Sequence, residues 1–166
     1  MDNQNKDIFW RTTKDQNTLK LINQDISLAV GNPGNPSRFN TTEAIIVTYD
    51  NVPKYLDSTK RFKFQVVIAT DYTNTFAILN YDRLDESGGV VGYGDSGYCT
   101  STKKFTDSLD TRVLNQTSNV GSPGKHIHLL TVDNLKYCWG SKFLTQKMLF
   151  DMIFVTHKTT ILTRKK

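Results

Sequence analysis

The first regular hydrophobic pattern along the chain predicts one short helix near its beginning. Between about Asp15 and Leu28, the apolar residues Leu19, Ile22 and Ile26 recur at spacings of three and four, which places them on one face of a helix. Segment 31–36 follows with the sequence Gly-Asn-Pro-Gly-Asn-Pro. Because proline and glycine do not continue a helix, we expect the helix to end before it.

The next hydrophobic patterns predict β-strands. Glu43 to Tyr49 is β-branched and almost continuously apolar, which is typical of a strand covered on both faces. We expect segment 51–53, Asn-Val-Pro, to close it. Arg61 to Ala69 first alternates, with Phe62, Phe64 and Val66 inward, and then becomes apolar throughout.

A hairpin is predicted by the polar turn at Asp71–Asn74, which separates Arg61–Ala69 from a further apolar strand at Thr75–Tyr81. The pattern fits two antiparallel strands with a four-residue loop. His126 to Val132 is also strand-like. The fold class is therefore α+β and mainly β, with an antiparallel sheet or sheets and one N-terminal helix packed against them. The predicted core comprises Leu19, Ile22, Ile26, Ile46, Val47, Phe64, Val66, Ile68, Phe76, Ile78 and Leu79.

Two segments have the composition of turns. Glycines gather between Ser87 and Gly97, where they permit left-handed backbone angles or close backbone approach. A tight turn is predicted at 119–124, with Asn119, Gly121, Pro123 and Gly124 as its structural residues. Whether the glycine-rich loop binds calcium, through Asp95 or Asp85, stays open at this stage.

The distribution of charge argues against a nucleic-acid-binding surface on the body of the protein. The chain has 166 residues and a formal net charge of +5. Six basic residues and one acidic residue lie in 141–166, so this basic tail carries the whole excess and residues 1–140 are neutral. A nucleic-acid binder is expected to carry positive charge on its folded face. The basic and aromatic run 60–64 fits a strand with charges outward.

The opening segment 1–7 lacks the apolar core of a signal peptide. Either the protein stays inside the cell, or this chain lacks its true start. No apolar stretch is long enough for a transmembrane helix. The length is that of one domain with a single core.

A serine hydrolase is one chemical reading of the sequence, because Gly94-Asp95-Ser96-Gly97 looks like the nucleophile motif of trypsin-like proteases. That mechanism needs a histidine base, an orienting carboxylate and an oxyanion hole. In that family the histidine precedes the serine, whereas all three histidines of this chain follow Ser96. We therefore predict no enzyme and no catalytic residues.

Other chemical motifs are weak. His126 and His128 share one face of a strand, but without further ligands at recognised spacing they are interpreted as a solvent-facing pair, and no metal or cofactor is predicted. Cys99 and Cys138 could form a disulfide in an oxidising compartment. Asn40 and Asn115 begin N-glycosylation triplets, which matter only if the chain is secreted.

Several segments, taken in order, resemble the NIDO domain, the extracellular module of nidogen, alpha-tectorin and a membrane-bound mucin. Together they run from about residue 9 to residue 133. One departure is Tyr49, where family members usually carry tryptophan. The matching segments are Phe9–Thr13, Phe39–Asn40, Ile46–Val52, Phe64–Asp71, Thr75–Tyr81, Val91–Tyr93 and Ser118–Gly124.

The resemblance implies a non-enzymatic extracellular module that contributes to cell–matrix adhesion or matrix assembly through contacts with matrix or cell-surface proteins. It implies that the missing signal peptide is a fragment boundary and that another segment could anchor the parent protein in a membrane. Residues 9–140 are then the NIDO-like domain, and 141–166 is a basic tail. The alternatives are a tail that binds anionic glycans, nucleic acids or lipids, or a hydrolase that uses Ser96.

Overall fold

The computed structural model describes residues 8–33, 35–54, 57–85, 92–93, 103–104 and 111–130. The chain divides into two compact units. One comprises Met1–Asp85 with Arg112–Thr131, and the other comprises Glu86–Thr111 with Val132–Lys166. In the described part of the second unit, the strands β5 (Gly92–Tyr93) and β6 (Lys103–Lys104) pair antiparallel.

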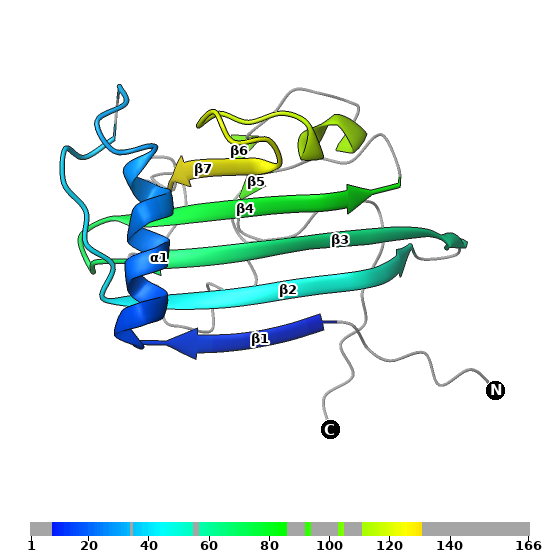
Figure 1. Ribbon diagram of the computed structural model, residues 1–166, viewed down its shortest axis with the longest axis horizontal. Helices are drawn as coiled ribbons and strands as arrows, with labels where there is room; N and C mark the ends of the chain where they lie inside the picture. Colours follow the sequence, from blue (N-terminus) through cyan, green and yellow to red (C-terminus); the bar gives the residue numbers. More distant parts are fainter. Residues whose placement is uncertain are drawn as a thin grey trace, which may run out of the picture. The chain divides into compact units, whose positions relative to one another are not determined.

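The first unit is built on a five-stranded sheet in the order β1-β2-β3-β4-β7, in which all neighbours are antiparallel (Figure 1). A 3-10 helix, η1 (Thr111–Asn115), precedes β7. The expected mainly β, antiparallel fold is confirmed. The strands are β1 (Ile8–Thr13), β2 (Glu43–Lys54), β3 (Asp57–Thr70), β4 (Thr75–Leu84) and β7 (Lys125–Leu129).

The helix α1 (Gln16–Ser27) crosses one face of this sheet (Figure 1). It begins where the Asp15 carboxylate accepts hydrogen bonds from the backbone N–H and the hydroxyl of Thr18, both at 2.8 Å. It ends at Leu28, whose N–H still bonds back into the last turn. The predicted helix and its buried face are confirmed. No helix among the described residues has the length and apolar character needed to cross a membrane.

Strand β2 does not close at segment 51–53, contrary to the sequence-based expectation. Asn51 adopts a left-handed backbone conformation with φ of 60°, which asparagine tolerates better than most residues. The register between β2 and β3 shifts there, and pairing resumes at Val52 and continues to Lys54. The irregular pairing between β2 and β3 therefore accommodates the backbone of Asn51 without ending β2, and Pro53 stays within the strand.

The predicted four-residue loop between β3 and β4 is confirmed. The Asp71 carboxylate accepts the backbone N–H groups of Thr73 and Asn74 at 2.8 and 2.6 Å, and Tyr72 takes a left-handed conformation with φ of 68°. This side-chain bonding replaces the water that the turn amides would otherwise need.

The core lies between α1 and the sheet. Phe76 and Ile78 of β4 are fully buried there, and Phe39 packs edge-on against Phe76 with ring centres 4.9 Å apart. Of the predicted core, Ile46, Val47 and Phe64 are only half-buried; the first two face the outer strand β1. The predicted core residues that are buried under α1 are Leu19, Ile22, Ile26, Phe76 and Ile78, whereas Val66, Ile68 and Leu79 are buried on the opposite face of the sheet.

Candidate interaction surface

The outer strand β1 exposes large apolar side chains. Ile8, Phe9 and Trp10 are 41%, 59% and 62% exposed. Successive side chains of a strand point to opposite faces, so Phe9 lies on the face that carries α1 and Trp10 on the other. Exposed aromatic side chains on adjacent positions favour contact with another macromolecule. The exposed side chains of β1 are therefore a candidate interaction surface.

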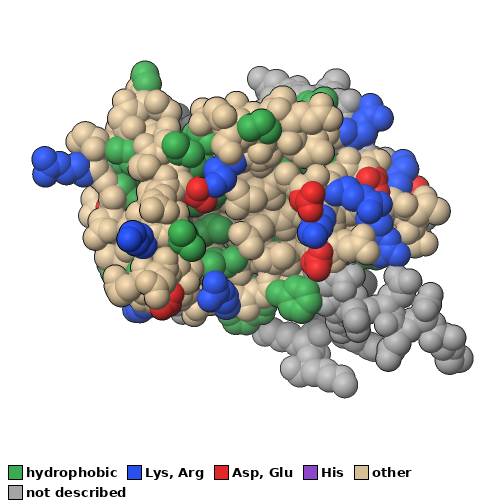
Figure 2. Space-filling view, in the orientation of Figure 1, with side chains coloured by type: hydrophobic (Ala, Val, Ile, Leu, Met, Phe, Trp, Pro, Cys, Tyr) green, Lys and Arg blue, Asp and Glu red, His purple; other side chains and the backbone are tan. Residues whose placement is uncertain are grey.

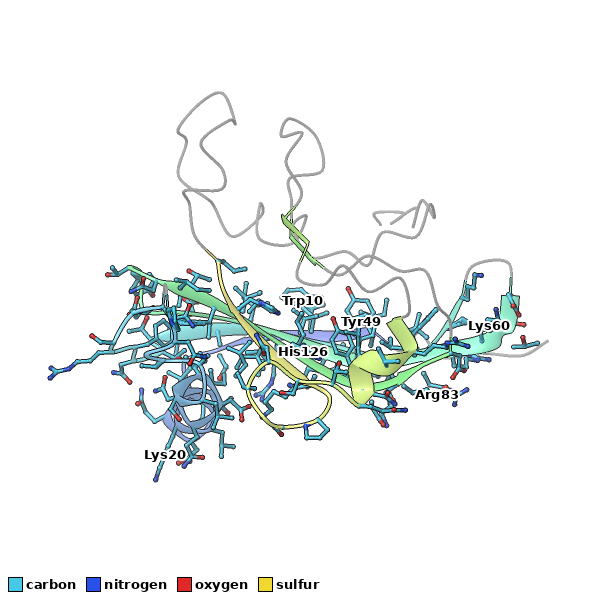
Figure 3. The ribbon with its side chains drawn as sticks, turned by 90° about the horizontal axis from the view of Figure 1, so that it is seen from above. Trp10, Lys20, Tyr49, Lys60, Arg83 and His126 are labelled. Carbon is cyan, nitrogen blue, oxygen red and sulfur yellow. The ribbon has the colours of Figure 1, made fainter. Side chains whose placement is uncertain are left out.

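An aromatic row crosses the face of the sheet opposite α1. The rings of Tyr49 and Phe64 stack with centres 4.3 Å apart, and Tyr81 lies 6.1 Å from Phe64. His126 meets Tyr81 edge-on at 5.7 Å. Trp10, Tyr49 and His126 point away from the helix, which carries Lys20 on the opposite side (Figure 3). The row thus joins β2, β3, β4 and β7.

The two tyrosines of this aromatic row are neutral at physiological pH. Burial raises the pKa of Tyr49 and, more strongly, that of Tyr81 above the ordinary value for a phenol. Tyr81 and its neighbours Val66 and Leu79 are buried. The two tyrosines therefore contribute neutral aromatic rings that pack against their neighbours in the row.

Acidic groups balance the basic groups where β3 and β4 extend past β1. Lys63 lies 3.5 Å from Asp50 and 3.4 Å from Asp82, and these carboxylates, Asp50 first, raise the pKa of Lys63. Basic and acidic side chains are interspersed on the visible face of this region (Figure 2). Among the described residues at this end of the sheet, such pairing leaves no continuous positive groove of the kind that tracks phosphates.

Asp85 is held by several hydrogen bonds at the same end of the sheet. The Arg83 guanidinium donates to both of its carboxylate oxygens at 2.6–3.0 Å, and the Arg61 N–H donates to Oδ2 at 2.9 Å. These bonds, those from Arg83 first, lower the pKa of Asp85 to about 2. Asp95 lies outside the described residues.

Asn23 of α1 connects the helix to the segment before β2. Its Nδ2 donates to Asn40 Oδ1 at 2.9 Å, and its Oδ1 accepts from the backbone N–H and the hydroxyl of Thr41 at 2.8 and 2.7 Å. Open hollows flank this contact, and both are lined by Asn23, Ser27 and Asn40. Their lining mixes polar side chains with apolar ones such as Val30 and Phe39, and the described residues around them do not form a cluster of titratable groups suited to catalysis.

The two asparagines of the glycosylation triplets lie in different environments. Asn40 is exposed, and among the described side chains Asn23 donates to its Oδ1. Asn115 is half-buried; its Nδ2 donates to the Asp82 carbonyl at 3.2 Å, and its Oδ1 is buried.

His126 and His128 are not a solvent-facing pair, contrary to the sequence-based interpretation. Both are half-buried, and Nε2 of His126 lies 3.3 Å from the Leu114 carbonyl and 3.4 Å from the Thr117 hydroxyl. Their face of β7 is the one that carries Tyr81, so packing covers them. Within the described ranges, no three His, Cys, Asp or Glu side chains are grouped as a metal site would require.

The predicted turn residues close the far edge of the sheet. The Asn119 side chain donates to the Ile127 carbonyl at 2.8 Å and accepts the Ile127 N–H at 2.9 Å, while the Ser118 hydroxyl donates to the Lys125 carbonyl at 2.7 Å. Gly121 and Gly124 have positive φ of 79° and 78°, and Pro123 is exposed. The sequence predicted a turn here. It did not predict that the side-chain amide of Asn119 would bond the backbone of β7 as a neighbouring strand would.

Three residues considered for chemistry in the sequence, Ser96, Cys99 and Cys138, lie outside the described residues, as does the basic tail. By contrast, the sequence did not predict strand β1. Its exposed side chains are the main feature that the structure adds to the candidate surface. Phe9 and Trp10 signal exposure only once the segment is known to be a strand, because two adjacent side chains of a strand cannot both face one core.

A helix-covered antiparallel sheet, with paired surface charges and exposed aromatic residues on an outer strand, defines an α+β module suited to contacts with other macromolecules. The nidogen-like domain (NIDO) family model matches residues 1–131, and the chain belongs to this family of extracellular, non-catalytic modules. No curated protein and no solved structure matches the chain significantly.

Proposed function

We propose that the protein is a non-enzymatic extracellular module that contributes to cell–matrix adhesion or matrix assembly through protein–protein contacts. The observation that carries this proposal is the nidogen-like family match over residues 1–131. Its partners are matrix or cell-surface proteins. The parent protein is either secreted or held at the cell surface by another segment.

The surface chemistry supports contact with proteins over contact with polyanions. Lys63 and Arg83 are paired with carboxylates, whereas Phe9 and Trp10 are more than half exposed. Aromatic residues are enriched at protein interfaces because they contribute large contact areas at low cost in side-chain entropy.

An adhesion assay tests this function. The full chain, secreted from eukaryotic cells, is coated on a surface, and the attachment of fibroblasts is counted against a surface coated with the heat-unfolded chain. We expect the folded chain to retain more cells than the unfolded control. In a second measurement, the folded chain is added to a cell-derived matrix and its retention is measured after washing. Equal cell attachment to both surfaces, together with no retention in this matrix, would contradict the proposal.

A labelling experiment separates this function from a hydrolase. The folded chain is treated with a fluorophosphonate probe, with trypsin as the positive control, because such probes react with activated serines. We expect no label on Ser96. Label on Ser96 that disappears on unfolding would replace the proposed function with an enzymatic one.

A further inference from the structure

The two edge strands of the five-stranded sheet, β7 and β1, differ in what the described residues place against their outer backbone groups. At β7, the Asn119 side chain exchanges both hydrogen bonds with the backbone of Ile127, at 2.8 and 2.9 Å. At the other edge, β1 pairs only with β2 among the described strands. An outer strand without a cover is a template for pairing with another strand.

The side chains of β1 make this edge favourable for pairing. Ile8, Phe9 and Trp10 are exposed apolar residues, and the only charged residue within Ile8–Thr13 is Arg11. No carboxylate lies within ion-pair distance of Arg11 among the described residues. The edge therefore lacks the clusters of charge and the prolines that commonly prevent strands from pairing.

We propose that β1 is a self-association site, at which β1 of a second copy of this chain pairs antiparallel and extends the sheet across a two-fold axis. This proposal rests on the function proposed above and names a partner and a surface for it. Its own evidence is the exposed side chains of β1 and the way this strand can pair with a copy of itself. The occupant is a second copy because one register of β1 against itself places its single charged residue, Arg11, opposite the exposed aromatic ring of Phe9.

The faces of the strand limit the registers that a two-fold axis allows. Directly opposed residues of antiparallel strands lie on the same face, so the axis passes through a residue pair. Centring on Phe9 pairs only Ile8–Trp10 of the described strand. Centring on Arg11 opposes two arginines, and like charges in that position destabilise the pair.

The register centred on Trp10 pairs Ile8–Thr12 in full. It places Phe9 of each copy opposite Arg11 of the other, twice by symmetry, on the face that carries α1. A guanidinium beside an aromatic ring is attracted to it. The two Trp10 side chains meet on the opposite face, where aromatic pairs on adjacent strands are stabilising.

The position of α1 leaves room for this arrangement. The helix crosses the sheet at the end of β1 that carries Thr13 (Figure 1). In the register centred on Trp10, the two Thr13 positions are six residues apart along the strands, or about 20 Å. A helix with its side chains is about 10–12 Å wide, so the two helices do not collide.

Opposite charge substitutions at Phe9 give the sharpest test, because its side chain is exposed and its replacement disturbs no core. Phe9→Glu places a carboxylate opposite Arg11 of the second copy, whereas Phe9→Lys places a second cation there. Sedimentation velocity of the full chain from about 10 µM to about 1 mM covers the weak affinities expected of so small an interface.

We expect the wild-type chain to dimerise in this range and Phe9→Lys to be monomeric. Phe9→Glu should dimerise at least about tenfold more tightly than Phe9→Lys at low salt, and this difference should shrink as salt rises. The double variant Phe9→Lys with Arg11→Glu should recover dimerisation, since lysine and glutamate then face each other in the Trp10 register.

Several outcomes would overturn the proposal. They are a monomeric wild type at every concentration, equal weakening by Phe9→Lys and Phe9→Glu, or no recovery in the double variant. Leu21→Lys is the control, because Leu21 is 63% exposed but lies on α1, and it should dimerise like the wild type. Cell attachment to the coated chain is measured separately with Phe9→Lys, so loss of dimerisation alone leaves the adhesion function standing.

Discussion

At the scale of single residues, Asp85 secures the end of β3 and β4 where these strands extend past β1. Its carboxylate binds Arg83 and the Arg61 N–H, and its own N–H donates to the Arg61 carbonyl at 3.2 Å. One side chain thus continues the pairing beyond Leu84, the last residue of β4. The charged form of Asp85 is the form that these donors require.

Replacing Asp85 with asparagine should make stability less dependent on acid pH. The folded pKa of about 2 lies below the unfolded value of about 3.9, so the ionised carboxylate stabilises the fold above pH 4, and that stability is lost as pH falls toward 2. Melting temperatures of wild type and Asp85→Asn should differ at pH 7 and converge near pH 2.

Arg83→Gln supplies the matched variant, because Arg83 makes the largest contribution to the lowered pKa of Asp85. It should reduce the same acid dependence. Melting curves of wild type and Asp85→Asn that stay parallel from pH 7 to pH 2 would contradict this role.

The two glycosylation triplets should differ in occupancy when the chain is secreted. A glycan bonds to the asparagine Nδ2; that atom donates to the Asp82 carbonyl in Asn115, whereas no described group accepts from it in Asn40. Peptide mapping after deglycosylation in heavy-oxygen water should therefore find Asn40 modified and Asn115 bare. Thr42→Ala should remove the glycan and Thr117→Ala should not; the reverse pattern would refute the assignment.

At the scale of elements, the turn before β7 depends on close backbone approach at one glycine. Gly124 accepts the Tyr81 N–H at 2.7 Å, and a Cβ on Gly124 would lie 2.6 Å from the Tyr81 carbonyl oxygen. A Cβ on Gly121 would meet nothing within 4 Å, although its φ is almost the same. The pair therefore separates backbone strain from steric overlap.

Alanine at these two glycines should cost different amounts of stability. Gly121→Ala carries only the left-handed strain of about 1 kcal/mol, whereas Gly124→Ala adds the overlap with β4 and should cost about 2–4 kcal/mol. Urea unfolding of both variants measures the difference. Equal losses would show that the turn moves away from β4 without penalty.

The sequence was sufficient to predict elements that a local pattern specifies, such as a hydrophobic repeat of one period or a run of turn-forming residues. Leu19, Ile22 and Ile26 predict α1, and the polar run at Asp71–Asn74 predicts the loop between β3 and β4. Strand β1 was missed because Phe9 and Trp10 are adjacent and both exposed, which breaks the alternation expected of a half-buried strand.

The remaining features depend on contacts between distant residues. Pairing between Asn119 and Ile127 joins a loop to a strand, and nothing in either local pattern specifies it. The environment of His126 was misjudged for the same reason, since Tyr81 and Leu114 approach it only in the folded sheet. Continuation of β2 past Asn51 depends on its partner β3, whose pairing resumes after the irregularity.

At the scale of the whole molecule, charge is distributed unevenly along the chain. Residues 1–140 are neutral, and 141–166 carries +5. A concentrated cationic segment attracts polyanions through interactions that salt screens over about 8 Å at physiological ionic strength. The full chain should therefore bind weakly to immobilised heparin and elute at modest salt.

Removing 141–166 should abolish this retention on heparin. Replacing Arg164, Lys165 and Lys166 with glutamine, which removes half of the basic residues in this segment, should lower the salt concentration of elution. Unchanged elution after the whole segment is removed would locate the attraction in the body of the protein.

The amide of Asn119 has a consequence for stoichiometry. If both margins of a sheet could recruit neighbours, each newly added molecule would offer a fresh place for the next, and growth would run on into filaments. Here the Asn119 amide occupies the Ile127 groups at one margin. Any joining of sheets through the remaining margin therefore terminates at two molecules, and raising the concentration should enrich that pair without producing longer polymers.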